Sequence, residues 1–192
     1  MKFHGHLCPG LALGYKSSIL AMHRLKEKKV SDEEIIGIVE NDSCFVDAVQ
    51  VITGCTFGKG NIFFKDYGKM ALTLLSRNTK RGLRVALKSG VLTQPQNMEI
   101  FSLMDKVLSG NASMEEKRLF EQFQLERAVR VLKSEPEEIF SVREVEMELP
   151  PSAKIMKSEI CGGCGEPVMV KKLVEINGSN LCIPCAQKRE FR

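Results

Sequence analysis

Residues 3–29 read FHGHLCPGLALGYKSSILAMHRLKEKK, a polar motif that runs directly into an apolar, regularly spaced segment. His4, His6 and Cys8 occupy every second position of the motif. In an extended chain such residues project from one face. After Cys8 and Pro9, the apolar spacing and the basic final turn predict a helix over residues 10–29. The stretch therefore predicts two imidazoles and a thiol that lie beside the start of a helix.

Three interpretations of FHGHLCPG remain open from the residues alone. The histidines can be ordinary surface or core residues, with Cys8 a small buried hydrophobe. Alternatively Cys8 is a reactive thiol, because a cysteine at a helix start has its thiolate stabilised by free amides. In the third interpretation His6 and Cys8, together with His4, bind zinc or a related transition metal, for which mixed imidazole and thiolate ligands are suitable.

A second polar segment, ENDSCFVDAVQVITGCTFGKGN at residues 40–61, favours the metal or thiol interpretation slightly. Its middle predicts a helix that starts near Cys44 and ends at Gly54. Cys44, Asp47 and Gln50 are spaced three residues apart, so a thiol, a carboxylate and an amide share one helix face. The glycine-rich end can bind an anion through backbone amides. It lacks the spacing of a nucleotide-binding P-loop.

The remaining pattern before residue 150 mixes strands and helices. Residues 34–40 predict a buried strand, and residues 61–90 predict two or three strands with a turn at residues 78–82. Ser113 and Glu116 form a capping-box pattern that opens a long amphipathic helix over residues 113–134. Because strict strand–helix–strand alternation is absent, the pattern indicates an α+β domain.

The C-terminal segment carries a structural zinc motif. Two CxxC pairs are separated by seventeen residues, and the four sulfurs are those of Cys161, Cys164, Cys182 and Cys185. This spacing is typical of a tetrahedral four-cysteine site. Residues 168–182 predict a hairpin with Asn177-Gly178 at its turn, and residues 185–192 a short helix. Knuckle, hairpin and helix together resemble a treble-clef finger, and a module this small depends on its metal for stability.

Composition places these parts in two domains, with the boundary at Pro150-Pro151: residues 1–149 and residues 150–192. The chain has 192 residues and a formal net charge of +4, of which the last 39 residues carry +3. We expect a cytoplasmic protein without a membrane span, because no apolar run reaches ~18 residues and no signal peptide is visible. In that compartment the seven cysteines are expected to be thiols or metal ligands rather than disulfides.

The run FHGHLCPG…GY…VENDSCFVDAVQVITGCTFGKGNIFFKDYGKMA closely resembles the FmdE family, named for a component of formylmethanofuran dehydrogenase. The resemblance implies a thioredoxin-like α+β core, with a five-stranded mixed sheet flanked by helices, followed by a treble clef. It also implies an active site in the core that can hold a metal. The motif positions that it carries over are His4, His6, Cys8, Cys44, Asp47, Gln50, Thr53, Cys55, Thr56, Lys59 and Asn61.

Within this set we predict catalytic roles for His6, Cys8, Cys44 and Asp47. A core metal, zinc or another transition metal, would take His6, Cys8 and Cys44 as ligands and leave a fourth position open, with His4 and Cys55 in reserve. Asp47 would support the ligands or touch substrate. The expected cofactor-binding residues are Gln50, Thr53, Cys55, Lys59 and Asn61.

Three functions follow as hypotheses. The first is a zinc protein associated with a molybdenum or tungsten oxidoreductase of one-carbon metabolism, whose subunits would be its partners. The second is a regulatory or adaptor module that uses the finger to bind nucleic acid or a protein. The third is a thiol redox protein built on Cys8, Cys44 and Cys55, which the absence of a CxxC pair in the core disfavours. We expect a homodimer, the commonest oligomer.

Overall fold

A computed structural model describes residues 2–29, 31–91, 98–152 and 156–190. The chain divides into two compact units, residues 1–152 and residues 153–192. Each unit has its own apolar core, and each is described by itself below.

The first unit is built on a five-stranded mixed sheet with the strand order β2-β1-β3-β4-β5. The strands are β1 (Ile35–Val39), β2 (Ile62–Phe64), β3 (Ala71–Ser76), β4 (Gly82–Leu87) and β5 (Phe140–Val145). β2 pairs with β1 in parallel, and the other three pairs are antiparallel. All residues of β1 and β3 are buried, as expected for central strands rich in aliphatic residues.

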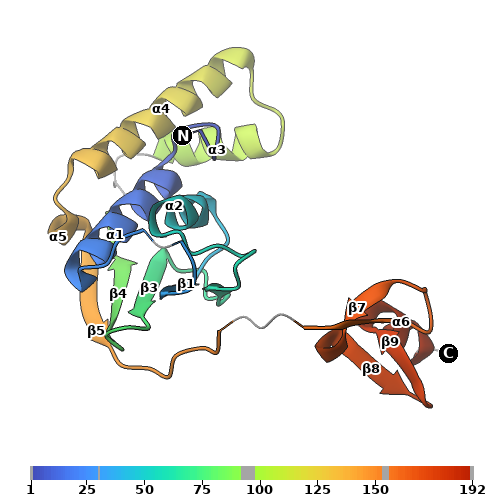
Figure 1. The fold of residues 1–192 in the computed structure, drawn as a ribbon. Coiled ribbons are helices and arrows are strands. Elements are labelled where there is room, and N and C mark those ends of the chain that lie inside the picture. The colour runs from blue at the N-terminus through green and yellow to red at the C-terminus, as the bar shows by residue number, and fades with distance from the viewer. Residues whose placement is uncertain (1, 30, 92–97, 153–155, 191–192) are drawn as a thin grey trace. The chain divides into compact units, whose positions relative to one another are not determined.

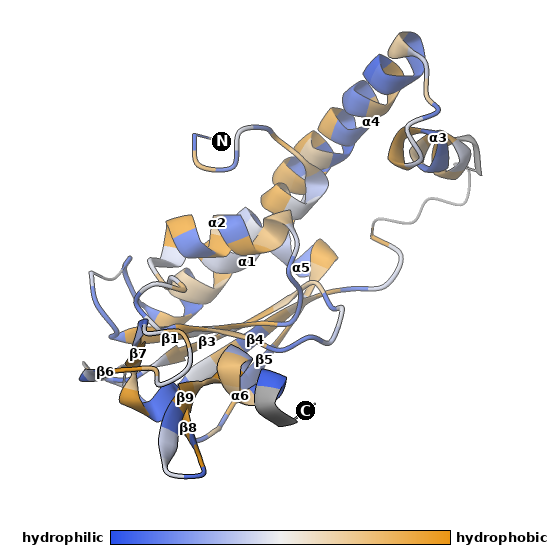
Figure 2. Cartoon of the chain, turned by 90° about the vertical axis from the view of Figure 1, so that its right-hand side faces the viewer, coloured by the Kyte–Doolittle hydropathy of each residue, from blue (hydrophilic) through white to orange (hydrophobic). Residues whose placement is uncertain are grey.

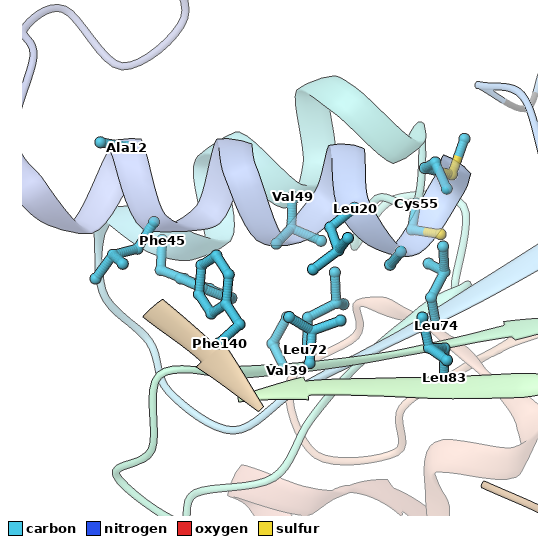
Figure 3. Packing of buried hydrophobic residues seen from close by; sticks show 14 of the residues in the cluster. Ala12, Leu20, Val39, Phe45, Val49, Cys55, Leu72, Leu74, Leu83 and Phe140 are labelled. Carbon is cyan, nitrogen blue, oxygen red and sulfur yellow. The ribbon is translucent and has the colours of Figure 1, made fainter. Parts of the chain in front are cut away.

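Two helices, α1 (Pro9–Leu25) and α2 (Cys44–Thr53), lie against each other over one face of this sheet (Figure 1). Their apolar sides meet the inward residues of the strands, and Figure 3 shows Phe45 and Val49 of α2 above Leu72 of β3. Cys8 caps α1 and Ser43 caps α2, each by accepting a backbone N–H of the first turn. A cysteine therefore lies at the start of each helix: Cys8 is the cap of α1, and Cys44 is the first residue of α2.

Three further helices complete the first unit. They are α3 (Met98–Leu108), α4 (Met114–Lys133) and α5 (Pro136–Ile139). The capping box at Ser113 and Glu116 is confirmed, since both reciprocal hydrogen bonds are present. Figure 2 shows α4 as a mixture of polar and apolar residues, in contrast to the apolar strands, and only Ala128 and Val131 of α4 are fully buried. Lys16 of α1 ties the end of α4 to the core by donating to the carbonyls of Leu132 and Ser134.

The second unit contains two short hairpins and a helix. The strands β6 (Ser158–Ile160) and β7 (Pro167–Met169) pair with each other, as do β8 (Leu173–Ile176) and β9 (Ser179–Cys182). A 3-10 turn, η1 (Val170–Lys172), joins the hairpins, and α6 (Ile183–Glu190) follows. The β8–β9 hairpin and its turn at Asn177-Gly178 are confirmed. The helix begins two residues before the expected position, and residues 191–192 of that prediction lie outside the described residues.

The α+β class, the five-stranded mixed sheet flanked by helices and the separate C-terminal finger are all confirmed. The sequence pattern had indicated no element at β5, α3, α5 or β6. It had also placed residues 168–172 in the hairpin of β8 and β9, whereas β7 pairs with β6 and residues 170–172 form η1. In the ranges that the structure covers, no helix is both long enough and apolar enough to cross a membrane. The more specific labels, thioredoxin-like and treble clef, stay predictions.

The close contact between α1 and α2 depends on Gly14. A Cβ atom at this position would overlap the carbonyl oxygen of Phe45, and Ala48 lies on the same side. Gly10, one turn earlier, is less constrained, because a Cβ there would lie 3.4 Å from Cβ of Cys44, which is ordinary van der Waals contact. Gly14 thus sets the separation of the two helices.

We expect Gly14→Ala to destabilise the protein by about 3 kcal/mol, because the new methyl group forces α1 and α2 apart in a packed core. Thermal unfolding followed by circular dichroism measures the effect. Gly10→Ala is the matched control and should change stability by less than about 1 kcal/mol, since alanine is a better helix former than glycine. Equal stability of the two variants would contradict the role assigned to Gly14.

Candidate metal centres

The cysteines at the starts of α1 and α2 face each other. Cys8 lies at the N-cap of α1, where its sulfur accepts the N–H of Leu11 at 3.4 Å. Cys44 is the first residue of α2, directly after the Ser43 cap. Since Gly14 allows the helices to approach closely, the two thiols are brought together from segments 36 residues apart in the sequence.

Four side chains form one cluster at this point: His4, His6, Cys8 and Cys44. One ligand atom from each lies within 4.8 Å of all the others. The rings of His4 and His6 pack at a centroid distance of 4.5 Å, and the outer one, His6, is exposed. Two ligands bonded to one zinc ion at about 2.0–2.3 Å must lie within roughly 4.6 Å of each other. Small side-chain movements therefore suffice for all four residues to bind one ion.

Asp47 fixes the orientation of His4. Its Oδ2 atom lies 2.7 Å from Nδ1 of His4, which directs Nε2 toward the Cys8 sulfur at 3.9 Å. A carboxylate on the far nitrogen of a metal-binding histidine is a common arrangement that sets the tautomer and raises the basicity of the ligand. From the sequence, His4 is expected only in reserve behind His6. The geometry makes His4 the more firmly positioned histidine.

The surroundings of Cys44 disfavour ionisation of its thiol. Burial raises the pKa of the Cys44 thiol above its usual range, and the neighbouring Cys8 raises it further. Cysteine binds metals as the thiolate, and a bound cation removes the repulsion between two neighbouring thiolates. The donor set therefore fits a borderline transition metal such as zinc.

A largely apolar cavity of about 780 Å³ adjoins the cluster on the side of the His4–Asp47 pair. This volume is within the range of small-molecule sites in proteins. Its walls come from the N-terminal segment, α1, α2 and the end of α4, and they include Phe3, Leu7, Leu11, Tyr15, Val51 and Ile52. Phe3 and Tyr15 remain 66% and 44% exposed, so both aromatic rings are accessible to a ligand. No pattern in the sequence had indicated this cavity.

Three residues expected to bind a cofactor make hydrogen bonds to the backbone in and around the loop after α2. Asn61 is fully buried, accepts the N–H of Thr56 at 2.9 Å and donates to the carbonyls of Asp32 and Ile35. Thr53 accepts the N–H of Cys55 at 3.0 Å, and Gln50 accepts the N–H of Phe57 at 3.3 Å. None of these side chains belongs to the described cluster or lines the apolar cavity.

Lys59 and Cys55 also lie apart from the cluster. The Lys59 ammonium group donates to the carbonyls of Ser31 and Asp32. Cys55 is fully buried in the core, where Figure 3 shows its sulfur among aliphatic side chains. Burial raises the pKa of this thiol to about 11, so it stays protonated at neutral pH. Of the two residues held in reserve as metal ligands, His4 therefore lies in the cluster and Cys55 does not.

The second unit holds the four-cysteine cluster expected from the two CxxC pairs. One sulfur from each of Cys161, Cys164, Cys182 and Cys185 lies within 4.8 Å of the others. The sulfurs of Cys164 and Cys182 are 3.9 Å apart, close to the roughly 3.8 Å that a tetrahedral zinc with 2.3 Å bonds imposes. The described four-cysteine cluster can therefore bind a zinc ion.

Backbone amides support this second cluster. Cys161 accepts the N–H of Cys182 at 3.1 Å and that of Gly163 at 3.3 Å. Such donors, that of Cys182 foremost, lower the pKa of the Cys161 thiol to about 6. The adjacent thiol of Cys182, together with burial, raises the pKa of Cys185 to about 12. The Cys161 thiol therefore ionises near neutral pH, whereas ionisation of the Cys185 thiol needs a bound cation.

Family models match both units. The model described as FmdE, molybdenum formylmethanofuran dehydrogenase operon, matches residues 3–141 and so includes the whole histidine–cysteine cluster. The chain belongs to the FmdE family. A second model, the prokaryotic dksA/traR C4-type zinc finger, matches residues 157–191. This FmdE-family chain therefore combines the family core with a C4 zinc finger.

Two similar proteins span nearly the whole FmdE-family chain. A protein of Archaeoglobus fulgidus, named "Probable S-adenosyl-L-methionine-binding protein", is 37% identical over 191 residues, which cover 96% of this chain. The chain spans only 50% of the length of that relative. The crystal structure of a tungsten formylmethanofuran dehydrogenase FmdE-like protein from Syntrophus aciditrophicus matches with a TM-score of 0.63 and 25% identity. That match covers 97% of this chain and 88% of the other.

Removal of metal should unfold the finger and leave the first unit folded, because the second unit buries only a small apolar cluster around Leu181. We expect a strong chelator to make residues 156–190 sensitive to limited proteolysis while the first unit stays resistant. Cys164→Ser should have the same effect without chelator. A finger that resists proteolysis in Cys164→Ser would contradict metal-dependent folding.

Proposed function

We propose that the core cluster holds a transition-metal ion and that this centre acts on a small molecule bound in the adjoining apolar cavity. The observation that carries the proposal is the convergence of His4, His6, Cys8 and Cys44 at the starts of two helices, with Asp47 orienting His4. A second support is the cavity of about 780 Å³, whose walls include His4 and Asp47 themselves.

Each residue has a defined role in this proposal. Cys8, Cys44 and His4 hold the ion, and the exposed His6 is the ligand that substrate or water can replace. A bound zinc or similar ion would supply a Lewis acid toward an oxygen or sulfur atom. Phe3, Leu7 and Tyr15 provide apolar contacts for the body of the substrate. The Asp47 carboxylate, which lines the cavity, offers a hydrogen-bond acceptor or a counter-charge.

The family membership gives this centre a context. We propose that the protein works with a molybdenum or tungsten oxidoreductase of one-carbon metabolism, as the FmdE name and the Syntrophus structure support. The relative named for S-adenosyl-L-methionine makes that compound a further candidate ligand for the cavity. The chain spans only half of that relative's length. We therefore propose the compound as a ligand and do not extend the relative's activity to this chain.

Metal content per chain tests the proposal. On protein purified without oxygen or added metal, we expect about two ions per chain by elemental mass spectrometry, since each of the two clusters has a complete donor set. Cys8→Ser should lose the core ion alone, and Cys182→Ser the finger ion alone. Asp47→Asn should keep the ion but weaken its binding by about 10- to 100-fold, as loss of an orienting partner does.

Cys55→Ala is the matched control, because it removes a buried thiol that belongs to neither cluster. It should leave the metal content unchanged. If the wild type holds a single ion that only Cys182→Ser removes, the core metal centre is refuted.

The finger favours a second candidate function, that of an adaptor. Five apolar side chains are 40–63% exposed on this small unit: Ile160, Met169, Val170, Val174 and Ile183. These exposed apolar side chains are the surface that a protein partner would cover in such an adaptor. The basic residues Lys171 and Lys172 are also exposed, so nucleic acid is the competing partner.

Salt dependence separates these partners. If the adaptor function is carried by protein docking, binding to single- or double-stranded nucleic acid should be weak and insensitive to Lys171→Ala/Lys172→Ala. A steep loss of binding with rising salt, which the double variant makes shallower, would instead identify nucleic acid as the partner. The pair Lys117→Ala/Lys133→Ala on α4 removes the same charge from the other unit and serves as the control.

A further inference from the structure

A second cavity, of about 540 Å³, lies at one end of the sheet in the first unit. It is formed by the residues that precede β3 and those that end and follow β4. Three cationic side chains line it, those of Lys69, Arg84 and Lys88, together with Ser89 and two glycines, Gly68 and Gly90. This cavity is therefore positively charged, whereas the cavity beside the core cluster is largely apolar.

Two hydrogen bonds fix the position of Arg84 in the wall of this cavity. Its Nε and Nη2 atoms donate to the two carboxylate oxygens of Glu40 at 2.6 and 2.7 Å. Both side chains are largely buried, at 17% and 8% exposure. The hydrogen bonds from Arg84 lower the pKa of Glu40, and Lys69 and Arg143 contribute through their charges. The Glu40 carboxylate is therefore ionised and neutralises one positive charge, that of Arg84. The charges of Lys69 and Lys88 in the cavity wall are not neutralised by it.

The two lysines keep donors available for a ligand. The Lys88 ammonium donates to the backbone carbonyl of Glu137 at 2.6 Å, and the carboxylate of Glu137 is paired with Arg24. The Lys69 ammonium lies 5.9 Å from the centre of the Tyr67 ring, a contact that uses no acceptor. Because each ammonium has three donors, both can still bind an anion.

The backbone adds donors at the rim. Among the hydrogen bonds between described residues, none uses the N–H of Ser89 or of Gly90. Gly90 has φ of 80°, and the space in which its Cβ would lie is open. Turns with free successive N–H groups bind anions. The rim thus offers backbone and hydroxyl donors in addition to the charges.

We propose that this cavity binds the phosphate group of a small phosphorylated metabolite. Ammonium, hydroxyl and backbone N–H donors, beside the positive charge of Arg84, match an oxyanion with three or four oxygens better than a carboxylate with two. The cavity volume lies in the range of small-molecule sites, which leaves room for more than the phosphate. The inference stands on these residues alone and does not rest on the function proposed for the core cluster.

The site lies close to the core cluster. Met70 lines the cavity, and its sulfur lies 3.7 Å from the hydroxyl oxygen of Ser43, whose proton is donated to Asn41 Oδ1 at 2.7 Å. Ser43 caps α2, whose first residue is Cys44. A phosphorylated ligand would therefore contact Met70, which in turn contacts the residue that caps α2.

Isothermal titration with inorganic pyrophosphate at low ionic strength tests the proposal. We expect saturable binding of about one molecule per chain, at least tenfold weaker in Lys69→Gln/Lys88→Gln. Arg84 is left unchanged, because its removal would leave Glu40 buried and unpaired. Circular dichroism should show that the double variant folds as the wild type does, since both lysines are exposed.

The matched control is Lys65→Gln/Lys117→Gln, which removes two exposed lysines of the same unit that lie outside the cavity. Pyrophosphate should bind to this control within about twofold of the wild type, which supports a localised site. An equal loss of affinity in the control, an unchanged affinity in the cavity variant, or absence of saturable binding in the wild type would overturn the proposal.

Discussion

The close contact of α1 with α2 is the constraint on which the rest of the first unit depends. It is possible because Gly14 has no side chain where the carbonyl of Phe45 passes. The helices then present a joint apolar surface to the sheet, and the core residues of all five strands pack against it. The same approach brings the helix N-termini together, so that a packing requirement also determines where Cys8 and Cys44 meet. The contact between α1 and α2 therefore determines both the packing of the core and the position of the candidate metal centre.

Both clusters bring thiols close together, but the surroundings of the thiols differ between the two units. In the finger, backbone N–H groups preform one thiolate at Cys161, and little apolar core lies beneath it. In the first unit, a large apolar core lies beside the cluster, and a carboxylate orients an imidazole toward the thiols. The finger cluster thus belongs to the fold of its unit, whereas the core cluster is placed upon a fold that already exists.

Much of this arrangement could be predicted from the sequence, because it is encoded locally. The starts of α1 and α2, the capping box at Ser113 and the CxxC pairs each depend on residues within a few positions of one another. The cofactor roles of Gln50, Thr53 and Asn61 were inferred from position in a motif. Whether such side chains face a ligand or a loop backbone depends on tertiary contacts, and here they bond the backbone. Both cavities were missed for the same reason, since their walls come from separate segments.

Cys8 has two tasks that compete for one sulfur atom: it caps α1 through the N–H of Leu11, and it is a candidate ligand. When no ion is present the thiol remains useful as a cap, so α1 keeps its first turn. The finger has no such alternative, because its cysteines have only one another and a small core. Loss of an ion from the core cluster would therefore leave α1 capped, whereas loss of an ion from the finger would remove the main support of its fold.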